Sequence, residues 1–475
     1  MSVAAAAAYT PGAVVPASSS VSPLAGCTIA DTGPGVKYPN TELEPSLAIN
    51  PRDPTNVVGS WQQDRWSSGA AAGSGFGASA DGGQTFTTGA IPGVTFCSGG
   101  SDFSRASDPW LTFAPDGTLY QMGLVETKVP TGGNTPTGMS VSRSDDGGFT
   151  WGGPTFIAYD TDTSLFNDKN SITADPTDAD YVYAIWDRLD SPPGKGSLKS
   201  SENTSGYRGP TLLARTTDGG DTWEPARIIY NLGTHNQTIG NQIVVLPNGT
   251  LVTLFNLIRN DNKGKIRGYN VAVIRSTDKG VTWDSNATLV SNLQFVRVTD
   301  PDTGAAVRTG DIIPEVAVDR TTGALYAVWQ DGRWANGAYS HVAFSQSMDG
   351  GRTWSTPTKI DNAPTNVNAF TPSIAVAHNG TVGVSYYDFR NNNAAPGLPT
   401  DYWFTSCTSG CTSPSSWSET HVEGSFNMEN APVARGYFLG DYQGIATAGN
   451  DFGLLFARSG SSPSTSDVVY TKVTP

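Results

Sequence analysis

The chain has 475 residues, of which 54 are glycine and only 15% are charged, a composition typical of many short strands joined by tight turns. Its formal net charge is −14, so it lacks the positive surface that nucleic acid binding requires. It contains no run of about 18 apolar residues, and we therefore predict no membrane span.

The N-terminal residues differ in composition from the rest of the chain. Residues 1–24 are rich in Ala, Ser, Pro and Val, and we predict a flexible lead-in there, followed by one domain over residues 25–475. The first nine residues lack the basic and strongly apolar regions of a signal peptide. We therefore expect the chain to start after a removed signal peptide and the protein to be secreted.

Four cysteines are present, an even number that suits an exported, glycine-rich chain with two disulfides. We predict the pairs Cys27–Cys97 and Cys407–Cys411. Four free thiols are the alternative, and the absence of nearby histidines disfavours a zinc site.

Seven pairs of short β-branched or aromatic runs follow one another along the chain, each pair around a turn such as Asn248-Gly249. Such pairs predict β-hairpins. The predicted hairpins cover residues 44–61, 108–120, 170–186, 241–255, 314–329, 372–386 and 442–456. A third strand follows each of the first five, whereas the sixth continues into the Cys407–Cys411 loop and the seventh into a last run at 468–473.

An eight-residue motif, Ser/Thr-x-Asp-x-Gly-x-Thr-Trp/Phe, ends the third strand of five units. Its copies lie about 60 to 72 residues apart and cover residues 79–86, 144–151, 216–223, 276–283 and 347–354. The Asp can accept hydrogen bonds from the backbone that follows it, the Gly supplies a positive φ, and the aromatic ring packs under the turn. Five copies at this spacing indicate a repeat architecture.

The five motifs resemble the Asp boxes, or BNR repeats, of the sialidase-like β-propeller superfamily, and this resemblance extends over nearly the whole chain. It implies an all-β fold, a single β-propeller of four-stranded blades, with the motifs on the face away from the active site. The hairpins give seven blades, and six, as the resemblance suggests, is the alternative. Because the seventh unit lacks an outer strand, we expect an N-terminal strand near Gly26 to Ala30 to close the ring.

The loops after the second strands lie on the face opposite the motifs, and an Arg recurs there, usually with an Asp just before it. A guanidinium binds an oxyanion in a bidentate manner, so these residues are candidates for binding an acidic substrate. The predicted substrate-binding residues are Arg65, Arg188, Arg259, Arg333 and Arg390, with Trp66 and Trp334 to stack on a sugar. The alternative is that the repeated Asp/Arg pairs are structural ion pairs between blades.

Ionisable residues in the same loops, and in those that lead into the first strands, are candidates for acid–base chemistry. The loops before the first strands contribute, among others, Glu44, Lys169, Arg308 and Asp441. The predicted catalytic residues are Asp108, Asp187, Asp331, Glu315, Tyr442 and His235. The resemblance implies a Tyr nucleophile paired with a Glu, for which Tyr442 and Glu315 are the candidates. It also implies an Arg-Ile-Pro triplet near the start, which this chain lacks.

Three functions stay open at this point. The first is an exo-acting, sialidase-like glycoside hydrolase that cleaves a terminal acidic sugar in the central channel. The second is a polysaccharide or oligosaccharide lyase that acts next to a uronate by β-elimination, with His235 or a tyrosine as its base. The third is a non-catalytic glycan-binding propeller. In each case we expect an oligosaccharide or polysaccharide partner, a monomer, and no cofactor or catalytic metal, with a structural calcium ion left open.

Overall fold

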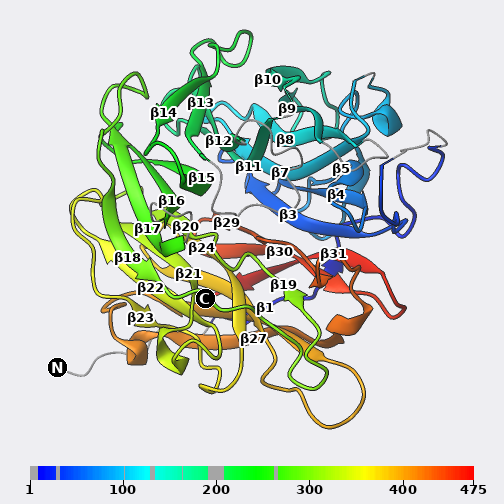
Figure 1. The fold of residues 1–475 in the computed structure, drawn as a ribbon, viewed down its shortest axis with the longest axis vertical. Helices are drawn as coiled ribbons and strands as arrows, with labels where there is room; N and C mark the ends of the chain where they lie inside the picture. Colours follow the sequence, from blue (N-terminus) through cyan, green and yellow to red (C-terminus); the bar gives the residue numbers. More distant parts are fainter. Residues whose placement is uncertain are drawn as a thin grey trace.

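The computed structural model describes residues 9–27, 33–100, 102–128, 134–162, 164–190, 208–260 and 266–475. These residues form an all-β fold of antiparallel sheets, together with four short 3-10 helices (Figure 1). None of the helices in the described part of the chain is long and apolar enough to span a membrane.

The strands and 3-10 helices follow one another in a repeating order. In chain order they are β1 (Thr10–Pro11), β2 (Val15–Pro16), β3 (Glu42–Ile49), β4 (Val57–Arg65), β5 (Ala71–Ser79), β6 (Thr87–Ala90), η1 (Phe96–Ser98), β7 (Arg105–Phe113), β8 (Leu119–Lys128), β9 (Asn134–Ser144), β10 (Thr155–Asp160), β11 (Leu165–Ala174), β12 (Val182–Asp190), β13 (Thr211–Thr216), β14 (Arg227–Tyr230), β15 (Asn236–Val245), β16 (Leu251–Asn260), β17 (Ile266–Ser276), β18 (Thr288–Leu293), β19 (Val307–Arg308), β20 (Glu315–Val318), β21 (Leu325–Asp331), η2 (Arg333–Ala335), β22 (His341–Ser347), β23 (Thr358–Lys359), β24 (Ala369–Val376), β25 (Val382–Asp388), β26 (Pro399–Cys407), η3 (Pro414–Ser416), β27 (Ser418–Asn427), η4 (Met428–Asn430), β28 (Tyr437–Phe438), β29 (Gly444–Ala448), β30 (Asp451–Ser459) and β31 (Ser466–Thr474).

The described strands pair in seven units, which we number in chain order. Units 1 to 6 are β3–β6, β7–β10, β11–β14, β15–β18, β20–β23 and β24–β27, and unit 7 is β29–β31. Units 1 and 2 are joined into one eight-stranded sheet by the pairing of Ala71 with Ala106. The first two strands of every unit form an antiparallel pair, so all seven predicted hairpins are confirmed.

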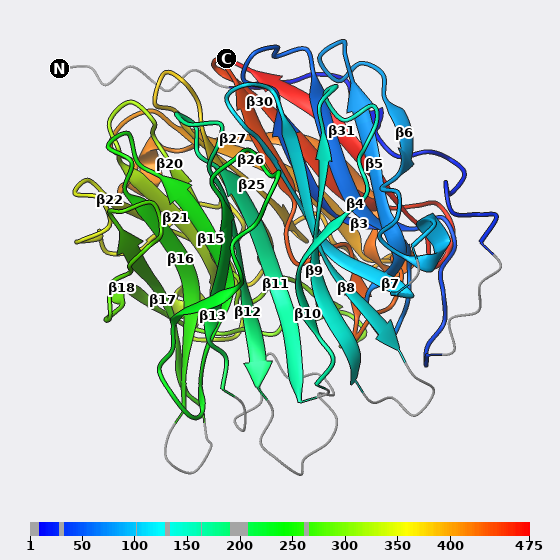
Figure 2. The same ribbon diagram turned by 90° about the horizontal axis from the view of Figure 1, so that it is seen from above.

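The seven first strands lie near the middle of the molecule, and the last strands lie at its periphery (Figure 1). The first strands pack against one another in a cycle: β3 against β7, β7 against β11, then β15, β20, β24 and β29, which returns to β3. Seen at right angles, the strands run together from one face of the molecule toward the other (Figure 2). Turns within the hairpins and the five motifs therefore share one face, because both connect strands at the same ends.

Each motif turn is held by its Asp side chain. In the first copy, Asp81 Oδ1 accepts a hydrogen bond from the Thr85 N–H at 3.0 Å, and Asp81 Oδ2 accepts one from the Thr85 hydroxyl at 2.6 Å. The other four copies repeat both bonds. The predicted Asx-type turn is thus present in all five motifs, and it fixes the connection between the third and fourth strands.

The motif turns also tie neighbouring units together. Asn56 of unit 1 donates from Nδ2 to the Gly147 carbonyl in the turn of unit 2, at 2.9 Å. Tyr120 of unit 2 donates its hydroxyl to the Gly219 carbonyl in the turn of unit 3, at 2.6 Å. These bonds satisfy carbonyls of the motif turns from the side of the neighbouring unit.

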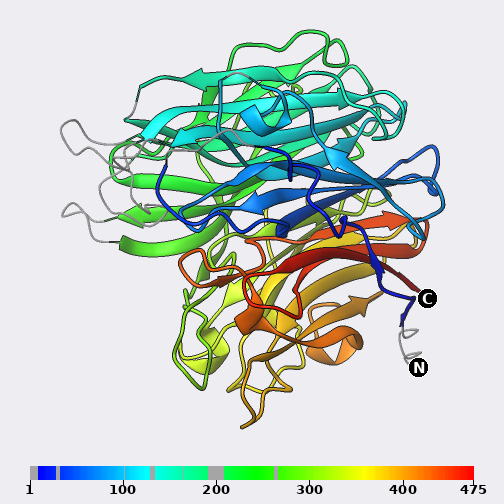
Figure 3. The same ribbon diagram turned by 90° about the vertical axis from the view of Figure 1, so that its right-hand side faces the viewer.

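The N-terminal segment lies along β31, the last strand of unit 7 (Figure 3). Thr10 pairs with Thr474, and Val15 pairs with Tyr470. The predicted strand near Gly26 to Ala30 is wrong in position: Gly26 lies in a turn, and residues 28–30 lie outside the described residues. The pairing residues instead come from the segment predicted as a flexible lead-in. Sequence patterns do not reveal these strands, because each has only two residues and one of them is a proline. Proline is tolerated here because an edge strand does not need every backbone N–H for the ladder.

Both predicted disulfides are confirmed, Cys27–Cys97 and Cys407–Cys411. The second closes the loop that follows β26, at the place where units 1 to 5 carry a motif turn.

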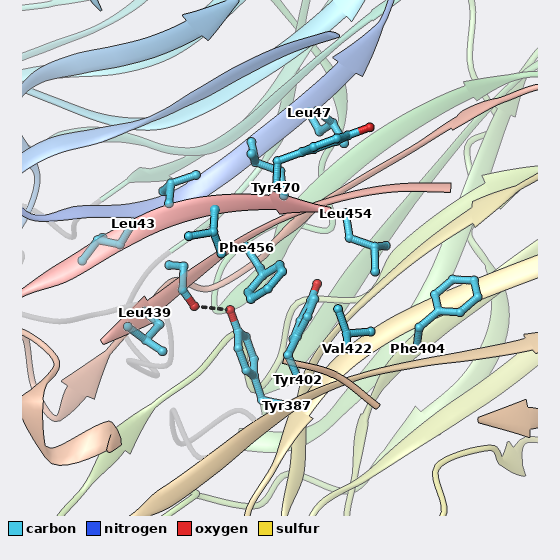
Figure 4. Packing of buried hydrophobic residues seen from close by; sticks show 14 of the residues in the cluster. Leu43, Leu47, Tyr387, Tyr402, Phe404, Val422, Leu439, Leu454, Phe456 and Tyr470 are labelled. Atoms are coloured by element: carbon cyan, nitrogen blue, oxygen red, sulfur yellow. Dashed lines mark hydrogen bonds between the residues drawn. The ribbon is translucent and has the colours of Figure 1, made fainter. Parts of the chain in front are cut away.

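A large apolar core joins units 6, 7 and 1 (Figure 4). Tyr402 stacks on Phe456 with ring centroids 4.1 Å apart, and the Tyr387 hydroxyl donates to the Ala457 carbonyl at 2.6 Å. Tyr9, from the N-terminal segment, enters the same core; its ring centroid lies 5.5 Å from that of Phe404. The N-terminal segment is therefore part of the packed structure.

Replacing Tyr9 by alanine is expected to lower the free energy of unfolding by about 3 kcal/mol, because it leaves a cavity in this core. The side chain is 5% exposed, and its hydroxyl also donates to the Asn450 carbonyl at 3.0 Å. Chemical denaturation measures the effect. Tyr159→Ala is the control: this tyrosine is 52% exposed, and its loss is expected to cost about 1 kcal/mol or less. Equal losses for the two variants would contradict the N-terminal packing.

Candidate functional site

A β-bulge interrupts the first strand of five units, and its first residue adopts a left-handed backbone conformation. The register of the pairing shifts at each bulge. The left-handed residues have φ between 43° and 69°, and they are Glu44, Asp108, Lys169, Gly240 and Thr371. Glycine adopts this conformation readily, but other residues are strained in it by about 1–3 kcal/mol. Bulges redirect side chains, and strain of this kind is common at functional sites.

The sequence accounts for the position of three bulges. Pro45, Pro109 and Pro372 follow the left-handed residue of β3, β7 and β24. A proline cannot donate a ladder hydrogen bond, so within a sheet it is accommodated where the ladder is broken.

Two bulge residues, Glu44 and Asp108, lie around the ammonium group of a third, Lys169. Its Nζ lies 2.7 Å from Asp441 Oδ2, 3.4 Å from Asp108 Oδ2 and 3.7 Å from Glu44 Oε1. These four side chains are 1% to 5% exposed. They come from β3, β7, β11 and the loop before β29, so the ammonium group joins four units at one end of their first strands.

Two arginines complete this group, which we call the Lys169 cluster: Glu44, Arg65, Asp108, Lys169, Arg308 and Asp441. Arg308 donates from Nη2 to Asp441 Oδ2 at 2.5 Å and from Nε to Oδ1 at 3.2 Å. Its guanidinium lies 4.1 Å above the ring of Phe438, and that of Arg65 lies 5.2 Å from the same ring. Arg308 and Phe438 are register partners in the parallel pair β19–β28, which therefore places the guanidinium over the cluster.

Polar side chains of unit 1 connect the members of the cluster. Gln62 donates from Nε2 to Glu44 and, at 3.0 Å, to the Ser107 hydroxyl, and its Oε1 accepts from Arg65. Ser107 in turn donates to Asp108 Oδ1 at 2.7 Å. A continuous network of this kind fixes the orientation of both carboxyl groups.

The cluster holds its carboxyl groups in different protonation states. Burial raises the pKa of Glu44 to about 8, against the opposing charge of Lys169 and with the support of Asp108 and Asp441. Burial also acts to raise the pKa of Asp441, but Arg308 and Lys169 outweigh it and hold that pKa well below its usual range. For Lys169, the three carboxylates outweigh burial, and its pKa lies well above the ordinary value. At neutral pH, Glu44 is therefore a neutral acid beside an ionised Asp441.

Several buried polar atoms in and beside the cluster lack a hydrogen-bond partner among the described residues. They include Asp108 Oδ2, Arg65 Nε and the Oδ1 of Asn170, whose own Nδ2 donates to the Asp108 carbonyl at 2.9 Å. Buried polar atoms are nearly always bonded, to protein or to water. Their concentration here is what a site for a hydroxylated ligand requires.

A cavity of about 260 Å³ extends among the first strands and is lined in part by Glu315 and Tyr442. Glu315 accepts hydrogen bonds from the Ser373 hydroxyl at 2.9 Å and from the Ile374 N–H at 3.2 Å, and thus links unit 5 to unit 6. Tyr442 donates its hydroxyl to the Pro109 carbonyl at 3.0 Å. Burial, aided by the charge of Glu44, raises the pKa of Tyr442 well above its usual range, which disfavours it as a nucleophile or base.

Apart from Arg65, the recurring arginines and their Asp partners do not converge on the cluster. Arg333 pairs with Asp331 at 2.7 Å, and Arg390 pairs with Asp388 at 2.5 Å, each within its own unit. Asp331 and Asp388 also accept a bond from the indole N–H of a tryptophan in the same unit. Arg188 pairs with Asp190 of its own strand at 3.3 Å. These pairs fix the loops after the second strands from within single units, whereas the structural alternative placed such pairs between blades.

The other predicted site residues are dispersed. Arg259 is exposed near the end of β16, and His235 is half-buried just before β15. Asp187 is buried in β12, opposite Asp168 of β11. The ring of Trp66 lies 4.3 Å from the Arg105 guanidinium, and Trp334 packs against the core between units 4 and 5.

Of the predicted residues, the structure therefore brings together Asp108 and Arg65, with Tyr442 close by. Glu44, Lys169, Arg308 and Asp441 stood among the ionisable loop residues without an assigned role. The sequence offers a signal for two of them. Glu44 and Lys169 stand at the same position, at the start of the first run of a predicted hairpin and two residues before a serine, in Glu44-Pro45-Ser46 and Lys169-Asn170-Ser171. Within the described ranges, no group of three or more His, Cys, Asp or Glu residues is placed to hold a metal ion.

No protein-family model matches the chain, and no curated protein is similar to it in sequence. Solved structures that resemble it include sialidases and an arabinanase. A Hadza microbial sialidase, Hz136, is 19% identical, with a TM-score of 0.45 over 74% of this chain and 66% of that one. The α-L-arabinanase of Penicillium chrysogenum is 12% identical, with a TM-score of 0.47 over 93% and 97% of the two chains. The intramolecular trans-sialidase of Ruminococcus gnavus is 14% identical, with a TM-score of 0.43 over 94% and 98%.

The buried carboxyl of Glu315 predicts a pH dependence of stability. Burial raises its pKa from 4.5 to about 8, so its contribution is complete below pH 4.5 and is lost as the pH rises toward 8. The free energy of unfolding of the wild type is therefore expected to fall between about pH 5 and pH 8. Glu315→Gln, which stays neutral, is expected to show a smaller fall, measured by urea unfolding across this range. An equal or steeper fall in the variant would contradict the neutral state of Glu315.

Proposed function

We propose that this protein is a glycoside hydrolase with its reaction centre at the Lys169 cluster. The observation that carries the proposal is a neutral carboxyl, Glu44, held beside the ionised carboxylate of Asp441, where buried polar atoms lack partners. Pairs of carboxyl groups whose pKa values are driven apart supply the acid and the base of glycosidases. We further propose that the seven units are the blades of one β-propeller, closed by the N-terminal segment on β31.

In the proposed reaction, Glu44 donates its proton to the glycosidic oxygen as the bond to the anomeric carbon breaks. Asp108 acts on the other side of the sugar, as the nucleophile or as the base that takes a proton from water. Both carboxyl oxygens lie within 3.7 Å of Lys169 Nζ, so they are at most about 7 Å apart, within reach of one glycosidic bond. The ionised Asp441 stabilises the positive charge that develops on the sugar ring.

The closed geometry favours a terminal sugar. The carboxyl groups are 1% to 4% exposed, and β19 with β28 lies beside them, an enclosure that suits the end of a glycan better than a continuous chain. Burial lowers the pKa of Arg65 to about 10, so the guanidinium keeps its charge at neutral pH and offers Nε to a sugar carboxylate or hydroxyl. We therefore propose exo-action on an acidic sugar of an oligosaccharide or polysaccharide.

The chemistry of the cluster supports hydrolysis better than β-elimination. A lyase needs a base near the α-proton of a uronate, whereas the Tyr442 hydroxyl donates a hydrogen bond to the Pro109 carbonyl. The two disulfides fit an oxidising compartment, and we propose that the protein acts outside the cell as a monomer.

Glu44→Gln and Asp108→Asn are each expected to lower kcat/KM by about 100-fold or more, because each removes an acid–base or nucleophilic group. Sugar release from a panel of sialosides, uronides and arabinosides is the measurement. Glu42→Gln is the matched control. Glu42 lies on the same strand, has a pKa that burial also raises to about 8, and accepts a bond from Gln63 at 2.6 Å outside the cluster.

The control is expected to keep its activity. Wild-type protein that binds these glycosides without releasing sugar would contradict the proposal, as would full activity in Glu44→Gln. Melting curves of all three variants show whether a loss of activity reflects a loss of fold.

A further inference from the structure

A second cavity, of about 580 Å³, opens between units 4 and 5 on the face that carries the motif turns. It lies at the other ends of the strands from the bulges and the Lys169 cluster, because β15 carries its bulge before Gln242 and its turn after Val245. The residues of its wall that bear on the argument are Asn248, Arg275, Trp283, Asp284, Met348 and Arg352. We call it the turn-face cleft.

The cleft exists where an arginine clamp between neighbouring units is interrupted. In unit 2, Arg143 donates from Nη1 to the Gly219 carbonyl in the turn of unit 3, at 3.1 Å. In unit 3, Arg215 donates in the same way to the Lys279 carbonyl in the turn of unit 4. The residue at the same position of unit 4 is Arg275, and its buried Nη1 has no hydrogen-bond partner within the described ranges. The clamp between units 4 and 5 is therefore missing.

A change in the neighbouring strand accompanies the loss of the clamp. Arg143 is the cross-strand partner of Tyr120, and Arg215 is the cross-strand partner of Tyr183. Tyr120 reaches the next turn, where its hydroxyl donates to the Gly219 carbonyl. The partner of Arg275 is Val252, which is smaller and carries no hydroxyl. Unit 4 thus has a smaller side chain where units 2 and 3 have the tyrosine that accompanies the clamp.

The wall of the cleft offers an aromatic surface and balanced polar groups. Trp283 is half-buried, and its indole N–H donates to the Gly280 carbonyl at 3.1 Å, which fixes the ring. Arg275 donates from Nε to Asp284 Oδ2 at 2.9 Å and keeps Nη1 for another acceptor. Arg352 donates to the backbone carbonyl of Asp349 at 2.8 Å, and Asp349 also belongs to the wall. The wall therefore carries two cations, Arg275 and Arg352, and two carboxylates, Asp284 and Asp349.

From this arrangement we propose that the turn-face cleft binds a neutral saccharide. An ordered aromatic ring supports the apolar face of a sugar, and paired guanidinium and carboxylate groups serve its hydroxyls as donors and acceptors. The absence of a net charge among these groups favours a neutral over an acidic ligand. The volume lies within the range of about 300–1,000 Å³ that small-ligand sites have. This inference does not rest on the proposed hydrolysis, since a saccharide can bind here without any reaction at the Lys169 cluster.

Fluorine NMR of protein that contains 5-fluorotryptophan tests the proposal, with the Trp283 resonance assigned by its loss in Trp283→Phe. The probes are maltotetraose, cellotetraose and arabinotetraose, each added to about 20 mM, which detects millimolar dissociation constants. Sialyllactose is the acidic comparison. We expect at least one neutral probe to shift the Trp283 resonance in a saturable manner, with a higher affinity than sialyllactose.

Arg275→Met is expected to weaken this binding by about fivefold or more, since it removes the charged donor that lacks a partner. Arg215→Met is the matched control, because Arg215 already donates to the Lys279 carbonyl and does not line the turn-face cleft, and this variant is expected to bind as the wild type does. Met348→Ala is a second variant; this side chain is 68% exposed, so the change leaves folding intact and is expected to weaken binding about twofold.

The proposal is overturned if no neutral probe shifts the Trp283 resonance, or if Arg215→Met weakens binding as much as Arg275→Met does. Glu44→Gln separates the two sites, since it is expected to lose hydrolysis and keep saccharide binding at the turn-face cleft. Failure of hydrolysis in the wild type, with the Trp283 shift intact, would count against the proposed function alone.

Discussion

One buried ammonium group, that of Lys169, holds three carboxyl groups from three other units within 3.7 Å. Without this cation, Glu44, Asp108 and Asp441 would face one another in a water-poor space, and like charges there repel strongly. Removing one partner of a buried ion pair leaves an uncompensated charge, at a cost of about 3–5 kcal/mol. The ammonium group therefore sets both the approach of the first strands and the protonation of the carboxyl groups between them.

The same arrangement depends on a rigid frame at the other face. Glu44, Asp108 and Lys169 reach the cluster because their backbones adopt left-handed conformations, which an isolated strand would not keep. The first strands pack in a cycle, and bonds such as that from Tyr120 to Gly219 tie several of the Asp-held turns to the neighbouring unit. Strain at one face is tolerated because bonds at the other hold the strands in place. At the turn-face cleft this coupling is weaker, and a cavity results.

Local chemistry made much of the fold predictable. Hairpins, motif turns and disulfides follow from residues that are close in sequence or recur at a fixed period, and each was found where it was expected. The N-terminal strands were not, because Thr10–Pro11 and Val15–Pro16 are too short for any periodic pattern and acquire their conformation from pairing with β31.

The site was harder to predict because its members come from separate units. An Asp followed two residues later by an Arg looks the same whether it faces a substrate or pairs internally, and Arg333 and Arg390 turned out to pair internally. Only the fold shows that Lys169 meets Glu44, 125 positions away in the sequence, and that burial makes this carboxyl neutral.

The protonation state of Glu44 is the most direct test of the account. Protein labelled with ¹³C at the glutamate carboxyl carbon gives one resonance that is lost in Glu44→Gln, and its shift can be followed through a pH titration. The account predicts that this resonance titrates near pH 8, the value to which burial raises the pKa of Glu44. Titration near the ordinary value of 4.5 would contradict it, since Glu44 would then be ionised at neutral pH and would have no proton to donate.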